Sequence, residues 1–211
     1  ADVAPGCDSV NQRVLGTLKV NRSELSDLEI GVQTSIGGGG QVDINYNSLS
    51  TIGLPLSILD ANQSTTILAN KINFNDVDSY GASSGLGTTA IYVASTAASP
   101  NNNTTTIKNN TLTDGGLSAA GTAILVGQVE KAITHKMAVT GNTFQGSSAN
   151  TGGGGLVAID TEDGVISGNA FLSAAGTWID ISSGDISQGF IGRDISGWAI
   201  VANEFSGSTA N

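Results

Sequence analysis

One short pattern decides the fold of this chain, and its clearest copy is Ile166-Ser167-Gly168-Asn169-Ala170-Phe171. It consists of an aliphatic residue, two further residues, an asparagine, one more residue and an apolar residue. Five other segments repeat it, with their asparagines at Asn47, Asn70, Asn110, Asn142 and Asn203. Residues 18–23 form a degraded seventh copy, with Asn21 as its asparagine and Ser23 in the apolar place.

A second element lies between successive copies of this pattern. Each consists of two aliphatic residues at positions i and i+2, which an extended strand places on the same face. The pairs are Ile30/Val32, Leu56/Ile58, Ile91/Val93, Ile124/Val126, Val157/Ile159 and Ile179/Ile181. We therefore expect a second strand in each repeat, with both aliphatic side chains pointing inward.

The two elements alternate along the chain, and successive asparagine motifs are 23 to 40 residues apart. This spacing matches one coil of a solenoid whose insertions fall between strands. The sequence predicts an all-β, right-handed parallel β-helix of six to seven coils over residues 18–205. Residues 1–17 are expected to form a partial cap or assembly arm with at most one or two helical turns, and residues 206–211 a polar tail.

The recurring asparagine has a physical role in such a solenoid. Asparagine tolerates left-handed and bridge backbone angles, which suits a sharp bend between strands. Stacked coils place each asparagine above the last, so that the amides can hydrogen-bond to one another and to the turn. We expect an asparagine ladder, and its predicted members are Asn21, Asn47, Asn70, Asn110, Asn142, Asn169 and Asn203.

The repeated pattern resembles that of the pectate-lyase-like right-handed parallel β-helix superfamily, over residues 18–205. The resemblance implies the fold and leaves the activity open, since the superfamily includes polysaccharide lyases and hydrolases, phage tailspikes and secreted adhesins. Its enzymes use a basic residue with calcium-binding carboxylates, or clustered aspartates, on adjacent coils.

The carboxylates closest to that arrangement follow two successive predicted strands. They are Asp160, Glu162 and Asp163, and then Asp180 and Asp185. If these carboxylates are functional, they could act as an acid pair or bind calcium. If they are not, they form an acidic loop on an acidic protein. We expect that these residues form no catalytic site and bind no metal or cofactor. The alternative is that they bind a calcium ion.

Basic and aromatic residues offer few further candidates. Lys131, His135 and Lys136 form the one basic cluster, which we interpret as a solvated loop. Tyr92 lies between two inward residues and Trp178 precedes another, so both are expected to point outward and to form a possible surface contact. Such a contact would be made with carbohydrate or with another subunit.

The overall composition favours an extracellular structural protein. Charged residues are 12 % of the chain, about half the usual share, and the net charge is −10. The eight basic residues are scattered, which argues against nucleic acid as a partner, and no apolar run is long enough to span a membrane. The start Ala1-Asp2-Val3-Ala4 fits a mature secreted chain, and Cys7 has no second cysteine for an intrachain disulfide.

Both ends of the predicted solenoid lack an obvious cap, because a good copy of the motif lies close to the last residue. We therefore expect a secreted subunit that associates with copies of itself end to end, as a filament, surface layer or adhesin. The alternative is a polysaccharide-binding or polysaccharide-degrading β-helix, such as a lyase, a hydrolase or a tailspike fragment.

Overall fold

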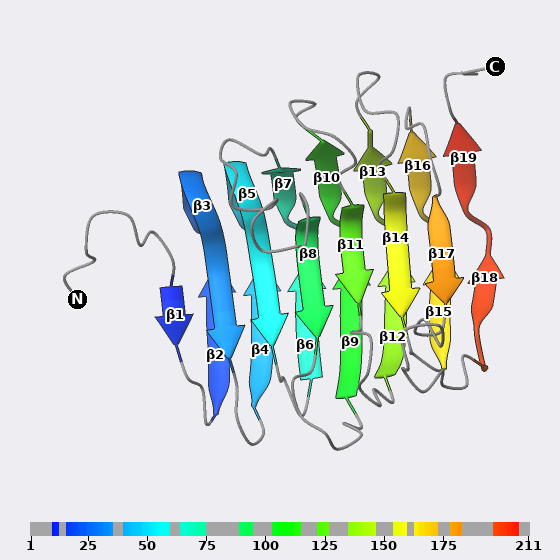
Figure 1. Cartoon of the computed structure of the whole chain (residues 1–211), viewed down its shortest axis with the longest axis horizontal. Coiled ribbons are helices and arrows are strands. Elements are labelled where there is room, and N and C mark those ends of the chain that lie inside the picture. Colours follow the sequence, from blue (N-terminus) through cyan, green and yellow to red (C-terminus); the bar gives the residue numbers. More distant parts are fainter. Residues whose placement is uncertain are drawn as a thin grey trace, which may run out of the picture.

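The computed structural model confirms a right-handed parallel β-helix of seven coils stacked along one axis (Figure 1). Every strand pairing in it is parallel, and each pairing joins one coil to the next. The residues that the structure describes are 10–12, 16–35, 40–59, 64–74, 89–94, 103–114, 122–126, 135–146, 154–159, 163–172, 178–182 and 196–206.

Three strips of strands run the length of the solenoid. The first strip is a seven-stranded sheet with one strand per coil. Its strands are β2 (Thr17–Asn21), β4 (Gln41–Asn45), β6 (Ser64–Leu68), β9 (Asn103–Lys108), β12 (His135–Thr140), β15 (Gly164–Ser167) and β18 (Ala199–Val201).

The second and third strips follow the asparagine turn in each coil, and together they form a 12-stranded sheet. In the first two coils a single long strand serves both strips, namely β3 (Glu24–Ser35) and β5 (Ser48–Leu59). The second strip continues with β7 (Lys71–Phe74), β10 (Thr111–Asp114), β13 (Thr143–Gln145), β16 (Ala170–Leu172) and β19 (Glu204–Ser206). The third begins with β1 (Val10–Gln12), which pairs with β3, and continues after β5 with β8 (Thr89–Ala94), β11 (Thr122–Val126), β14 (Gly154–Ile159) and β17 (Ile179–Ser182).

The core consists of columns of like side chains, because each coil repeats the register of the one before it. Ile44, Ile67 and Ile107 are directly stacked and completely buried. In the second strip the rings of Phe144 and Phe171 lie parallel, with centroids 4.5 Å apart. Each side chain is therefore buried mainly by its counterparts in the neighbouring coils, and an end coil lacks one of them.

The asparagine ladder follows one edge of this core. Each ladder asparagine donates its backbone N–H and its Nδ2 to the Oδ1 of the next ladder asparagine, as Asn70 does to Asn110 at 2.8 and 2.9 Å. The same Nδ2 also donates to a main-chain carbonyl of the preceding coil, that of Ile44, at 2.9 Å. The five members from Asn47 to Asn169 are buried. The ladder therefore satisfies the polar groups of the turn without water.

The predicted membership of Asn21 in the ladder is wrong, and Ser23 occupies that position. Asn21 pairs with Asn45 in the strand register, two residues before the ladder. The N–H of Ser23 donates to Oδ1 of Asn47 at 2.9 Å, as the ladder asparagines do in later coils. The aliphatic position of coil 1 is therefore Val20, stacked on Ile44, and the asparagine is replaced by serine.

The bend itself is made one residue earlier than expected. The residues with left-handed φ angles directly precede each ladder position, and the asparagines themselves are not among them. These residues are Arg22, Tyr46, Ala69, Asn109, Gly141, Gly168 and Ala202, with φ between 54° and 66°. Asparagine is thus selected here for its amide, and the backbone strain is borne by the residue before it.

The third strip contains the predicted strands, but the inward residues differ in coils 1 and 5: in coil 1 Val32 is in the main core, whereas Ile30 belongs to a separate buried cluster with Leu54. In coil 5 Leu156 and Ala158 point into the core, whereas the prediction named Val157 and Ile159, whose side chains lie outside the described part of the structure. Register explains the difference, since Leu156 stacks on Ile124 of the preceding coil. Gly154 and Gly155 begin β14. Gly155 faces the Phe171 ring, which a Cβ would contact at 2.8 Å.

The N-terminal segment contains a strand where at most helical turns were expected. Val10–Gln12 is β1, whose register with β3 places Val10 beside Val32. It therefore belongs to the third strip and begins the solenoid one partial coil before β2.

Replacing Asn110 by alanine should lower the free energy of unfolding by about 3 kcal/mol or more, because it leaves three buried partners unpaired. These partners are the backbone N–H of Asn70, the one Nδ2 hydrogen of Asn70 that does not bond to the carbonyl of Ile44, and the carbonyl of Ile67. Chemical denaturation of wild type and variant measures the difference. Asn109→Gly is the matched control, because glycine occupies this position in two later coils. Equal losses in both variants would contradict the ladder's structural role.

Two buried threonine hydroxyls allow a second test, in which the substitution is expected to raise the stability of the fold. Thr65 and Thr105 are stacked in register and completely buried, and neither Oγ1 has a hydrogen-bond partner. Their column continues with Val42 and Met137, so the site is apolar on both sides. The double variant Thr65→Val/Thr105→Val should stabilise the fold by about 1–2 kcal/mol, since valine has the same shape without the unpaired hydroxyl. Thr66→Val, outside this column, should change the unfolding midpoint little.

Candidate functional site

The structure does not assemble the predicted carboxylates into a site among the residues it describes. Asp163 is exposed at the turn before β15, where its backbone N–H donates to the carbonyl of Ser196 at 3.1 Å. Asp180 is exposed in the middle of β17, in the other sheet. Within the described part of the chain no three His, Cys, Asp or Glu residues are grouped closely enough to hold a metal ion. Asp160, Glu162 and Asp185 lie outside the described residues.

The basic cluster is only partly described. Lys136 is exposed in β12, where it pairs with Thr104 of the preceding coil. His135 is the first residue of that strand, and Lys131 lies outside the described residues.

Trp178 points inward, contrary to the prediction. It packs against the main core, and its ring meets Phe171 edge-on with centroids 5.6 Å apart. Trp178 precedes β17, so the alternation of a strand does not govern its side chain. Its partial exposure arises because it lies near the C-terminal end of the solenoid.

Tyr92 is also not the exposed contact residue that was predicted, because only 8 % of it is accessible. It belongs to a second apolar cluster with Ile30, Leu54 and Ala94, separate from the main core that contains Ile91 and Val93. It does therefore point away from its neighbours, as alternation requires. Burial raises the pKa of the Tyr92 hydroxyl above its ordinary value.

This burial predicts a loss of stability at high pH. Above about pH 10 the unfolded state releases the phenol proton while the folded state retains it, so stability falls as pH rises toward the folded pKa. Ultraviolet titration should show a tyrosine transition above the ordinary pKa of a phenol, and Tyr92→Phe should abolish that late transition. A late transition that persists in the variant would place the raised pKa at another tyrosine.

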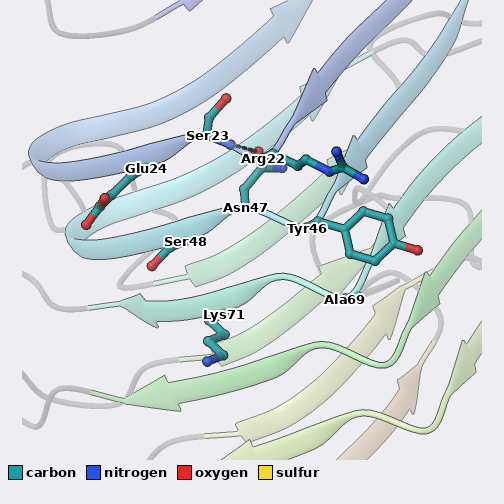
Figure 2. A pocket seen from close by; sticks show the side chains of 8 residues that line it. All are labelled: Arg22, Ser23, Glu24, Tyr46, Asn47, Ser48, Ala69 and Lys71. Carbon is teal, nitrogen blue, oxygen red and sulfur yellow. Dashed lines mark hydrogen bonds between the residues drawn. The ribbon is translucent and has the colours of Figure 1, made fainter.

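A hollow lies on the outside of the asparagine turn in coils 1 to 3. It measures about 430 Å³, and its lining residues are Arg22, Ser23, Glu24, Tyr46, Asn47, Ser48, Ala69 and Lys71. Figure 2 shows Arg22 and Tyr46 on one side of Asn47, and Glu24 and Ser48 on the other. Tyr46 is 57 % exposed and was not singled out by sequence reasoning. Three of the residues that line the hollow belong to coil 1, three to coil 2 and two to coil 3.

The C-terminal end of the solenoid exposes the core itself. Ile200 and Phe205 are 48 % and 51 % exposed, whereas Ile166 and Phe171, their counterparts in coil 6, are completely buried. The Phe205 ring stacks on Phe171 at 5.1 Å with its other face uncovered by any described residue. Coil 7 thus presents the surface that each earlier coil buries against its successor.

The ladder ends at this surface with unused donors. Asn203 accepts from the backbone N–H and the Nδ2 of Asn169, at 3.0 and 2.9 Å, and its own Nδ2 donates to the carbonyl of Ile166. No described residue accepts from its backbone N–H or from its second Nδ2 hydrogen. Two hydrogen-bond donors therefore point along the solenoid axis.

The N-terminal end presents the opposite side of the same columns. Leu18, Val20 and Leu25 are half-buried and pack against the core on one side only. In the third strip this end is covered by β1, as Figure 1 shows. The two ends are therefore the chemically distinctive surfaces of the described molecule.

Comparison with known protein families, curated proteins and solved structures found no match to this chain. No helix in the described ranges is long and apolar enough to cross a membrane.

Proposed function

We propose that this chain is an extracellular structural subunit that polymerises end to end into a filament. The observation that carries the proposal is the free face of coil 7, where the core residues Ile200 and Phe205 are each about half exposed. Six interfaces of this kind already exist within the chain, one between each pair of successive coils. A further coil of the same geometry is the surface that fits it, and coil 1 of another copy supplies one.

Energetics favour this use of the free face. Burying an aliphatic or aromatic side chain completely contributes about 1.5–3 kcal/mol, and coil 7 offers several half-buried ones. Its strand edges also carry unpaired N–H and C=O groups that a second strand would satisfy. Head-to-tail contacts between unlike faces do not close, so they propagate as a fibre. Seven coils at about 4.8 Å each give an axial repeat of about 34 Å.

The extracellular setting belongs to the same proposal. It is supported by the low share of charged residues and the net charge of −10. The asparagine motif and the ladder also support placing the chain in the pectate-lyase-like superfamily. No described group of residues favours the enzymatic alternative.

Two variants that each block one end test the proposal. Phe205→Glu places a charge on the free face of coil 7, and Leu18→Glu does so on coil 1. Wild type should form fibres with the expected axial repeat in electron microscopy, and each variant alone should remain monomeric. A mixture of the two should stop at dimers, because each copy retains one working end. Circular dichroism checks that both variants keep the β-fold.

The result that would reject the proposal is wild-type protein that stays monomeric over a wide concentration range. Fibres formed by the Phe205→Glu variant alone would reject the role of the coil 7 face.

A further inference from the structure

The two ends of the described solenoid are complementary parts of one coil. Coil 7 consists of β18 in the first strip and β19 in the second, and no third-strip strand follows them in the described part of the chain. At the other end, β1 is a third-strip strand with no described first-strip or second-strip strand in its own coil. The C-terminal end therefore has the first-strip and second-strip strands of a coil, and the N-terminal end has a third-strip strand.

Resting on the proposed function, we propose that β18 and β19 of one copy and β1 of the next together complete a single composite coil. This coil is held in the register of the internal coils. In the third strip, β17 of one copy pairs with β1 of the next. The internal register sets that pairing, since Leu156 pairs with Ile179 at one end and Val10 pairs with Val32 at the other. Ile179 therefore meets Val10 of the next copy, and Asp180 meets Asn11.

The same register brings coil 7 of one copy onto coil 1 of the next. Val20 stacks on Ile44, and Ile166 on Ile200, so Ile200 meets Val20 of the next copy. In the second strip, Phe205 meets Leu25 by the same reasoning. Both contacts cover side chains that are now partly exposed.

Two features make this junction weaker than an internal interface. The first is Ser23, which occupies the ladder position of coil 1. The free donors of Asn203 need an acceptor there, and a serine hydroxyl is one atom shorter than the Oδ1 of asparagine. Its Oγ lies 3.4 Å from the carbonyl of Asn21 within its own coil. The ladder is thus interrupted once per subunit.

The second feature is a pair of like charges. Glu24 stacks on Ser48, and Ala170 on Glu204, so the junction register places Glu204 of one copy directly over Glu24 of the next. Both glutamates are exposed in the isolated chain. Like charges directly opposite each other in a sheet are destabilising. The nearby cations do not cancel this repulsion, because Lys71 is two coils away from Glu24 and Arg22 lies on the other side of the ladder position (Figure 2).

The register makes quantitative predictions about assembly. Ser23→Asn should lower the critical concentration for fibres about tenfold, because it restores the missing hydrogen bonds across the junction. Asn21→Ser exchanges the same residue types outside the ladder and should leave the critical concentration unchanged. Glu204→Lys and Glu24→Lys should each lower it about fivefold by replacing repulsion with attraction. The double variant Glu24→Lys/Glu204→Lys should return it to the wild-type value.

The composite coil is tested directly by cross-linking, in a Cys7→Ser background. Adjacent strands lie about 4.8 Å apart, within the Cα separation that a disulfide requires. A chain carrying Asn11→Cys and Asp180→Cys should form disulfide-linked ladders of subunits on oxidation. The control carries Asn11→Cys and Ser182→Cys, which are displaced by two residues along the strand, and should not cross-link.

The outcomes separate the two proposals. If wild-type protein never assembles, both the proposed function and this inference are rejected. Fibres could instead form while the control pair cross-links as well as the first pair, or while the first pair does not cross-link at all. Either result would be consistent with the proposed function and would reject the composite coil. If neither the charge-reversal variants nor Ser23→Asn change the critical concentration for fibres, the proposed register is rejected.

Discussion

The structure depends on one hydrogen-bonding unit, the asparagine amide at the turn after each first-strip strand. Only an amide carries an acceptor for the coil before it and donors for the coil after it, at a reach that matches the strand spacing. Aspartate would lack the donors, and serine lacks the reach. The ladder therefore fixes which residue of one coil lies above which residue of the next, and the apolar columns follow from that register. The insertions between strands vary freely because they take no part in it.

Much of this could be predicted from the sequence, because the motif repeats and its asparagines stand where the register requires them. The exception at Asn21 arose because residues 18–25 contain two possible frames, each with an aliphatic residue and a polar residue in plausible places. Only the contact between Ser23 and Asn47 in the next coil selects the correct frame. The difference in coil 5 has the same origin, since alternation allows either face of a strand and the neighbouring coil decides between them.

Site residues were harder to predict, for a related reason. Residues on adjacent coils approach each other only after the lengths of the insertions and the register are known, so the acidic residues around Asp163 and Asp180 could not be grouped from spacing alone. Tyr92 and Trp178 were assigned outward from local alternation, whereas their surroundings come from other coils. The exposed columns at coil 7 could be anticipated, because they follow from the repeat itself.

The polarity of the ladder explains why assembly through the ends should give a filament and not a closed dimer. Every ladder donor points from one coil to the next in the same direction, so the free donors accumulate at coil 7 and the position for their acceptor lies at coil 1. Two coil 7 faces brought together would oppose donor to donor and would run their strands antiparallel, against a register that is parallel throughout the chain. Two coil 1 faces would leave the free donors at both outer ends unsatisfied. Only the head-to-tail arrangement pairs the free donors, continues the apolar columns and keeps the strands parallel. It also leaves the same two faces, coil 1 and coil 7, exposed after each addition.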